Sequence, residues 1–547
     1  DADNTSLRID SIAPGFTVSV DGVAATVETV FPAVATLQIT PPAGFTGSVS
    51  NAVSLSAYDG ILFSEPVPIA VNVTAPPPIS TPTPIPPTPV PSPSPQPSGR
   101  SNFDPCDLTV CGDTAIVLPA PPSTELADQA VNLSTLEQQF TLAFQSHLGL
   151  RAANSGTINQ AKQTAVEIER ETGAKPAFVY VGFVPAQLPS IIASTILQIQ
   201  GAPTDQLELL MITGQGNPIR KRFAVTREQV LAIVRQFNRE VSDPRKIRTT
   251  SYLQSSQQLY QWVIAPLAAE LQTQQINNLV FLMDEGLRSL PIAALHSGQG
   301  FLIEQYSVGL MPSLSLSDTR YRDVRKSQVL GLGISQKVGE QAPLPTLPVE
   351  LAAIAQNQWQ GKSFLNEAVT LSNLKALRQQ QPYGILHLAT HADFQPGTLN
   401  DSYIQLWDSQ LRLDQIRQLG WSNPQVELLV LSACVTALGD RTAELGFAGL
   451  AVQSGVKSAL ASLWYVSDTA TTAMMASFYN QLQTAQIKAE ALRSTQLAMA
   501  KGQIVLRNGQ VQVLGRALTL PADVQEPDRD FSHPYFWSAF TIVGNPW

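Results

Sequence analysis

The hydrophobic pattern of the chain changes near residue 125. Beyond that point, short uninterrupted apolar runs alternate with longer segments in which apolar residues recur every three to four positions. The apolar runs indicate buried strands and the periodic segments indicate amphipathic helices. Strands are predicted at 177–183, 207–213, 277–284, 328–335, 383–391, 426–434 and 457–464, and helices at 226–240, 348–359, 467–483 and 487–502. Buried strands joined by helical crossovers predict a three-layer α/β fold with a mainly parallel sheet between helices.

Residues 1–74 have a different pattern, with apolar and polar residues alternating in short runs at 16–20, 36–40 and 52–58. Turns rich in Gly, Pro and Asp-Gly separate these runs, which is typical of a small all-β sandwich. The motifs PPAGFTGSV and SLSAYDG resemble the ends of cadherin-like or bacterial immunoglobulin-like repeats, and the short length fits an incomplete domain. That resemblance makes Asp1 and Asp3 candidate calcium ligands, the alternative being two solvated carboxylates.

The segment between these two regions is rich in proline. Residues 75–100 can form neither helix nor sheet, because proline fixes φ and removes amide donors, so they are predicted to form a polyproline II tether. Residues 101–124 follow as a loop-like stretch in which Cys106 and Cys111 are close enough to form a local disulfide in an oxidising compartment. The third cysteine, Cys434, is left alone after an apolar strand.

Composition excludes two classes of partner. The net charge of −9 and the lack of a basic stripe argue against binding to nucleic acid or to an anionic membrane surface. No apolar run is long enough to cross a bilayer, and the first residues do not follow the order of a signal peptide. Since the chain starts at Asp1, we expect a fragment or a processed product.

Chemistry is predicted at the carboxyl ends of two strands. One apolar strand ends at His391 and the next along the chain ends at Cys434, with a helical connection that suits parallel neighbours. An imidazole and a thiol at one sheet edge can perform nucleophilic attack on a peptide carbonyl, with the histidine moving the proton. The backbone N–H groups of Cys434 and Ala392 are the predicted oxyanion donors, and the sequence indicates no third catalytic residue.

Several ordered motifs carry a resemblance to a known family. HLATHA (387–392), LSACVTALGD (431–440), AELGFAGLAVQSGVKSALASLWYVSD (443–468) and HPYFWSAFTIVG (533–544) resemble CHAT domains, which are caspase-like cysteine peptidase domains. The resemblance covers about residues 125–547 and implies a non-catalytic caspase-like half at 125–240 followed by a catalytic domain at 241–547. It also implies a caspase-like three-layer sandwich with a mainly parallel sheet.

The same resemblance assigns roles to residues. His391 and Cys434 correspond to the catalytic dyad, and Trp464 and Asp468 to a loop beside the substrate groove, with Asp468 a contact for a basic substrate side chain. The position after the catalytic histidine is often Gly in this fold and is Ala392 here, which bears on the geometry of the oxyanion site. Adjacent TPR repeats, which often accompany such domains, are not apparent in this chain.

A zinc site at the histidines and roles for two carboxylates are further possibilities in the sequence. His387 and His391 have the spacing of a helical zinc pair, but their segment has the pattern of a strand and lacks HExxH, so His387 is expected to be a structural residue beneath the site. Asp440 and Glu444 either tune the Cys434 loop or cap a helix. No metal or other cofactor is expected in the α/β domain.

The sequence thus predicts a cysteine endopeptidase that cleaves a protein substrate and is regulated by a partner or by self-processing. The alternative is a secreted or surface scaffold, for adhesion or signalling, in which a caspase-like domain without activity binds partners. The β-domain, the proline tether and the Cys106/Cys111 pair favour an extracellular or cell-surface location, with a cytoplasmic location as the alternative.

Overall fold

The chain forms two compact units, residues 1–112 and 113–547, in a computed structural model. The structure describes residues 6–20, 23–27, 29–32, 37–42, 47–58, 67–73, 133–150, 156–185, 201–436, 438 and 440–547. The tether at 75–100, the cysteines Cys106 and Cys111, and the candidate calcium ligands Asp1 and Asp3 lie outside these residues. Each unit is described by itself.

The N-terminal unit contains two small antiparallel sheets. One has the strand order β4-β1-β6-β7 and the other β3-β2-β5. The strands are β1 Ser6–Ile12, β2 Thr17–Val20, β3 Val23–Ala25, β4 Val30–Pro32, β5 Leu37–Thr40, β6 Gly47–Tyr58 and β7 Val67–Val73. Ile9, Val18 and Val53 come from both sheets and pack into one apolar cluster. The all-β class predicted from alternation is therefore confirmed, and the structure adds strands that the sequence did not indicate, β1 among them.

The large unit is built on one 13-stranded sheet. Eleven of its strands have the order β10-β9-β8-β11-β12-β24-β19-β18-β15-β13-β14, β16 pairs with β15, and β17 pairs with β16. Its strands are β8 Pro176–Val184, β9 Gln206–Thr213, β10 Ile219–Thr226, β11 Asn278–Met283, β12 Ser307–Leu310, β13 Val329–Gly333, β14 Gly361–Leu365, β15 Ile385–Phe394, β16 Tyr403–Gln405, β17 Gln410–Arg412, β18 Leu428–Thr436, β19 Ser458–Ser462 and β24 Phe540–Gly544. Parallel pairings predominate, and β8, β9 and β10 form an antiparallel edge.

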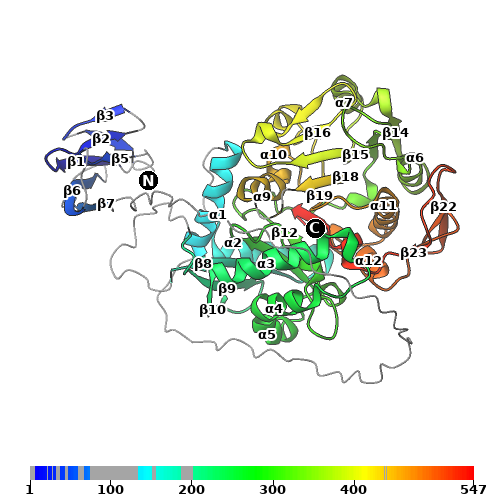
Figure 1. The fold of residues 1–547 in the computed structure, drawn as a ribbon, viewed down its shortest axis with the longest axis horizontal. Coiled ribbons are helices and arrows are strands. Elements are labelled where there is room, and N and C mark those ends of the chain that lie inside the picture. The colour runs from blue at the N-terminus through cyan, green and yellow to red at the C-terminus, as the bar shows by residue number, and fades with distance from the viewer. Residues whose placement is uncertain are drawn as a thin grey trace, which may run out of the picture. The chain divides into compact units, whose positions relative to one another are not determined.

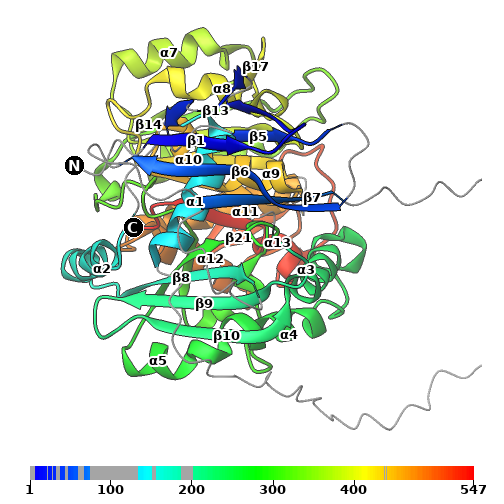
Figure 2. The same ribbon diagram turned by 90° about the vertical axis from the view of Figure 1, so that its left-hand side faces the viewer.

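Helices cover both faces of this sheet, with α9 and α10 on one side of β18 and β19 and α11 and α12 on the other (Figure 1). Figure 2 shows α3 beside the β8–β10 edge. The helices are α1 Leu133–Leu148, α2 Ile158–Thr172, α3 Arg227–Ser242, α4 Leu253–Val263, α5 Ala268–Thr273, α6 Leu347–Leu351, α7 Leu371–Gln380, α8 Leu413–Ile416, α9 Arg441–Ala448, α10 Leu450–Ser454, α11 Asp468–Leu482, α12 Lys488–Ala500 and α13 Pro534–Trp537. The predicted α/β fold with a mainly parallel sheet is confirmed.

Two details differ from the pattern expected from the sequence. The helix expected at 348–359 is the short α6 followed by a π-helical stretch, Ala352–Gln358. A small antiparallel sheet, β22-β21-β20-β23, follows α12. Its strands are β20 Val505–Arg507, β21 Gln510–Val513, β22 Arg516–Thr519 and β23 Arg529–Asp530. Strands from both sides of residue 240 belong to the same large sheet, so the two parts expected at 125–240 and 241–547 share one core.

Candidate active site

The two candidate catalytic residues lie on neighbouring parallel strands. β15 carries His391 and β18 carries Cys434, and the strands pair from Ile385 opposite Leu428 to Phe394 opposite Thr436. Because both strands run in the same direction, their carboxyl ends meet at one edge of the sheet, where sites in α/β folds collect. The strands do not end at the two residues as expected: β15 continues to Phe394 and β18 to Thr436.

The register offsets the two residues by one position. His391 lies opposite Ala433, and Ala392 lies opposite Cys434. The offset arises because the register shifts between Leu388 and His391, where β15 advances three positions while β18 advances two.

The imidazole of His391 is held by a backbone carbonyl. Its Nε2 lies 2.8 Å from the carbonyl oxygen of Ala342, in the loop between β13 and α6. A carbonyl can only accept, so Nε2 carries the hydrogen, and in the neutral form of the ring Nδ1 is the unprotonated nitrogen. The ring also stacks on Tyr465, with the ring centroids 6.3 Å apart. Ala342 thus supplies an orienting group that the sequence did not indicate, because a backbone carbonyl has no residue signature.

Ala392 lies inside the sheet rather than at a turn. It pairs with Cys434 of β18 on one side and with Ile404 of β16 on the other, and its side chain is buried. Ala392 is therefore not the last residue of its strand. Its role as an oxyanion donor stays a prediction.

The two residues expected beside the substrate groove have different environments. Trp464 is only 6% exposed, and its indole N–H donates to the carbonyl of Tyr535. The next residue, Tyr465, is 40% exposed and is the aromatic side chain that contacts His391. The sequence indicated an aromatic loop here, but it could not tell which of two adjacent rings faces outward.

Asp468 is partly buried at the first position of α11. The backbone N–H of Thr346 donates to its carboxylate at 2.6 Å, which links α11 to the loop that also carries Ala342. Burial raises the pKa of Asp468 from 3.8 to about 6, and the hydrogen bond from Thr346 acts in the opposite direction. The structure thus brings Asp468 into contact with Thr346.

A buried polar network lies beneath this region. His387 is fully buried, with Nε2 2.9 Å from the Glu350 carboxylate and Nδ1 3.1 Å from the Tyr479 hydroxyl. Thr472 contacts Glu350 at 3.4 Å and Thr346 at 2.7 Å. These bonds join β15, α6 and α11, so His387 is the structural residue that the sequence predicted.

The helix after Cys434 is fixed by two carboxylates. Asp440 caps α9 by accepting from the backbone N–H groups of Thr442 and Ala443. Glu444 is buried and accepts from the backbone N–H of Gly286 at 3.0 Å and from the hydroxyl of Ser289. Burial raises the pKa of Glu444. Its two hydrogen bonds hold α9 against the turn after β11.

The raised pKa of Asp468 makes a prediction about stability. Because the native state holds this proton more tightly than the unfolded chain, with pKa values of about 6 and 3.8, the contribution of Asp468 to stability falls as pH rises from about 4 to 6. We expect Asp468→Asn to remove this part of the pH dependence while keeping an acceptor for Thr346. Urea unfolding at several pH values measures it, with the exposed Asp408→Asn as the matched control. An unchanged slope in Asp468→Asn would contradict it.

No group of three or more His, Cys, Asp and Glu side chains in the described ranges could hold a metal ion. Among the helices that the structure describes, none is long and apolar enough to cross a membrane.

Comparison with protein families gives the assignment. The CHAT domain family matches residues 253–545, which is more than half of the chain and includes both candidate catalytic residues. The chain belongs to the CHAT domain family. The matched part of the CHAT domain runs from the start of α4 to the residue after β24.

Solved structures similar to this CHAT protein include two of the Saccharomyces cerevisiae separase–securin complex. Both are 9% identical to the chain, with TM-scores of 0.43 and 0.38, and cover 75% and 71% of it. The CHAT protein spans about a third of the length of the chains matched, 33% and 31%. With identities and TM-scores this low, nothing about function follows from these two structures. No curated protein matched the sequence.

Proposed function

We propose that this CHAT protein is a cysteine endopeptidase that uses His391 and Cys434 to cleave a protein substrate. The observation that carries the proposal is the pairing of β15 with β18, which brings the backbones of the two residues next to each other at one edge of the sheet. Membership of the CHAT family, whose domains resemble caspase-like peptidases, supports the same chemistry.

The orientation of His391 supports a defined catalytic role. With Nε2–H donated to Ala342, Nδ1 is free to take the proton of the Cys434 thiol and later to deliver it to the departing amine. The thiolate forms a bond to the substrate carbonyl carbon, and the amide bond then breaks to leave an acyl-enzyme that water hydrolyses. The backbone N–H groups of Cys434 and Ala392 are the proposed donors to the oxyanion.

We propose that the activity is regulated by a protein partner or by self-processing, as the sequence analysis predicts.

The surroundings of His391 support a substrate path. Tyr465 is exposed beside the imidazole and can form a wall of the groove, with Trp464 buried behind it. We keep Asp468 as the proposed contact for a basic substrate side chain, since its carboxylate is partly exposed. An extracellular or surface location, and calcium binding at Asp1 and Asp3, are proposed from the sequence alone.

A peptidyl electrophile tests this proposal against the alternative of a scaffold without activity. We expect a peptidyl acyloxymethyl ketone to label Cys434, at a rate that depends on the peptide sequence and falls strongly in His391→Ala. Intact mass and peptide mapping identify the labelled residue, and Cys106 and Cys111 are internal controls. If the rate of Cys434 labelling depends neither on the peptide sequence nor on His391, the result would favour the scaffold without activity.

A further inference from the structure

A cavity of about 490 Å³ lies along one face of α3, and His391 is not among the residues that line it. Its lining includes side chains spaced three to four positions apart through almost the whole helix, from Arg227 to Ser242. A helix of this length extends about 24 Å, which an extended peptide of about seven residues would span. The shape therefore fits a stretch of polypeptide better than a small ion. We call this cavity the α3 groove.

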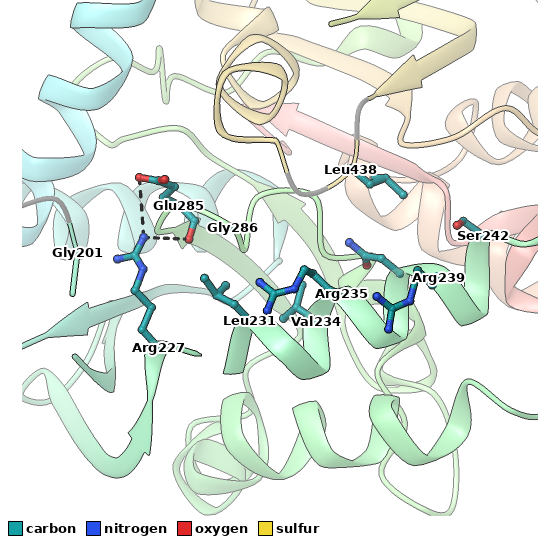
Figure 3. A pocket seen from close by; sticks show the side chains of 11 residues that line it. Gly201, Arg227, Leu231, Val234, Arg235, Arg239, Ser242, Glu285, Gly286 and Leu438 are labelled. Atoms are coloured by element: carbon teal, nitrogen blue, oxygen red, sulfur yellow. Dashed lines mark hydrogen bonds and ion pairs between the residues drawn. The ribbon is translucent and has the colours of Figure 1, made fainter. Parts of the chain in front are cut away.

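The α3 groove carries two arginines that form no ion pair with any residue that the structure describes. Arg235 and Arg239 are exposed, and neither forms a hydrogen bond or ion pair with another residue in the described part of the chain. Arg227, by contrast, is buried and lies 3.7 Å from the Asp284 carboxylate and 3.8 Å from that of Glu285. Figure 3 shows Arg235 and Arg239 in sequence along the helix.

The carboxylates near the end of α3 do not cancel this charge. Glu240 pairs with Lys246, although the charge of Arg239 also helps to lower the pKa of Glu240, and Asp243 pairs with Arg245 at 2.8 Å. An occupant of the groove that carries carboxylates would therefore meet two guanidinium groups that form no hydrogen bond or ion pair with the described residues.

A buried amide in the groove has a partner for its donor but not for its acceptor. Asn238 is 5% exposed, and its Nδ2 donates to the carbonyl of Ser289 at 3.4 Å. Its Oδ1 is buried and accepts no hydrogen bond from any described residue. A buried acceptor without a partner is destabilising, so an occupant whose N–H reaches this oxygen would remove that cost. A peptide backbone has such a donor.

The groove also contacts the segment that follows the nucleophile. Leu438, on the loop between β18 and α9, lines it opposite α3 (Figure 3). Gly286 lines the other side, and its backbone N–H donates to Glu444 of α9. Gly286 has a φ of +82°, a conformation that favours glycine, and a Cβ there would lie 2.7 Å from Cδ2 of Leu231.

We propose that the α3 groove is an exosite that binds an extended acidic segment of the protein substrate and thereby acts on the loop after Cys434. Carboxylates of the segment pair with Arg235 and Arg239, a backbone N–H donates to Asn238, and an apolar side chain packs against Leu231, Val234 and Leu438. This role deepens the proposed peptidase function and rests on it, whereas binding of the acidic segment can be measured without catalysis.

Binding is measured with the full-length Cys434→Ala protein and a fluorescein-labelled octapeptide of alternating glutamate and leucine. We expect saturable anisotropy that weakens with added salt, and at least about tenfold weaker binding when Arg235 and Arg239 are both changed to glutamate. Asn238→Ala should weaken binding several-fold. The matched control reverses two other exposed arginines, Arg417 and Arg516, and should bind as the parent does. Thermal melts of each variant establish that it is folded.

Three results would overturn the exosite. They are equal binding of an octapeptide in which glutamine replaces glutamate, full binding by the R235E/R239E variant, and binding of millimolar inorganic phosphate to the protein when no peptide binds. Turnover gives the second readout: a substrate with the acidic segment should have a lower KM than its glutamine version in the active protein. If the acidic peptide binds through the arginines but nothing is cleaved, the exosite stands and the peptidase proposal fails.

Discussion

Replacement of His391 by alanine should reduce turnover of a cleavable substrate by about 10³-fold or more, and replacement of Cys434 by alanine should abolish it. Without the imidazole, nothing takes the thiol proton or returns it to the amine, and without sulfur no covalent intermediate forms. His391 is only half-buried, so its loss should change the free energy of unfolding by less than about 1 kcal/mol. Initial rates at saturating substrate, with melting curves beside them, measure both effects.

The matched control for this experiment is a variant with Cys106 and Cys111 changed to alanine, which keeps Cys434 as the remaining thiol. It should retain the activity of the parent. If His391→Ala keeps more than about a tenth of the parent's rate, His391 is not catalytic. If the activity depends on Cys106 or Cys111, Cys434 is not the nucleophile.

The second large effect is expected on stability. Glu350 is 1% exposed, and its carboxylate contacts the imidazole of His387 and the hydroxyl of Thr472. Glu350→Ala leaves both groups buried without this partner and opens a void, so we expect the free energy of unfolding to fall by about 3 kcal/mol. Urea denaturation at neutral pH measures the change.

Two variants calibrate that result. Glu350→Gln keeps a side chain of similar size with one acceptor, so it should cost about half as much. Glu340→Ala removes an exposed carboxylate of the loop before α6 and should stay within about 0.5 kcal/mol of the parent. A Glu350→Ala protein as stable as the parent would mean that the network joining β15, α6 and α11 contributes nothing to folding.

The charge reversal of Arg235 and Arg239 and the pH dependence of Asp468 examine separate parts of the molecule. The arginines line the α3 groove and contribute nothing to the β15–β18 ladder, whereas Asp468 binds the loop that carries Ala342. Either prediction can therefore fail without affecting the other.

The sequence alone determined the fold class and the two strands that carry the candidate catalytic residues. Hydrophobic periodicity is a local property, so the apolar runs at 383–391 and 426–434 could be recognised as strands, and the helical connection between them indicated parallel neighbours. The structural role of His387 followed in the same way, from its position inside a buried strand.

The tertiary structure decided what depends on contacts between distant segments. Register is set by pairing along the whole of two strands, so the one-residue offset between His391 and Cys434 could not be read from either strand alone. The Ala342 carbonyl that orients His391 is a backbone group that any residue could supply. Likewise, Tyr465 rather than Trp464 faces outward, and Arg235, Asn238 and Leu438 form one groove, because packing brings together side chains that have no common pattern in the sequence.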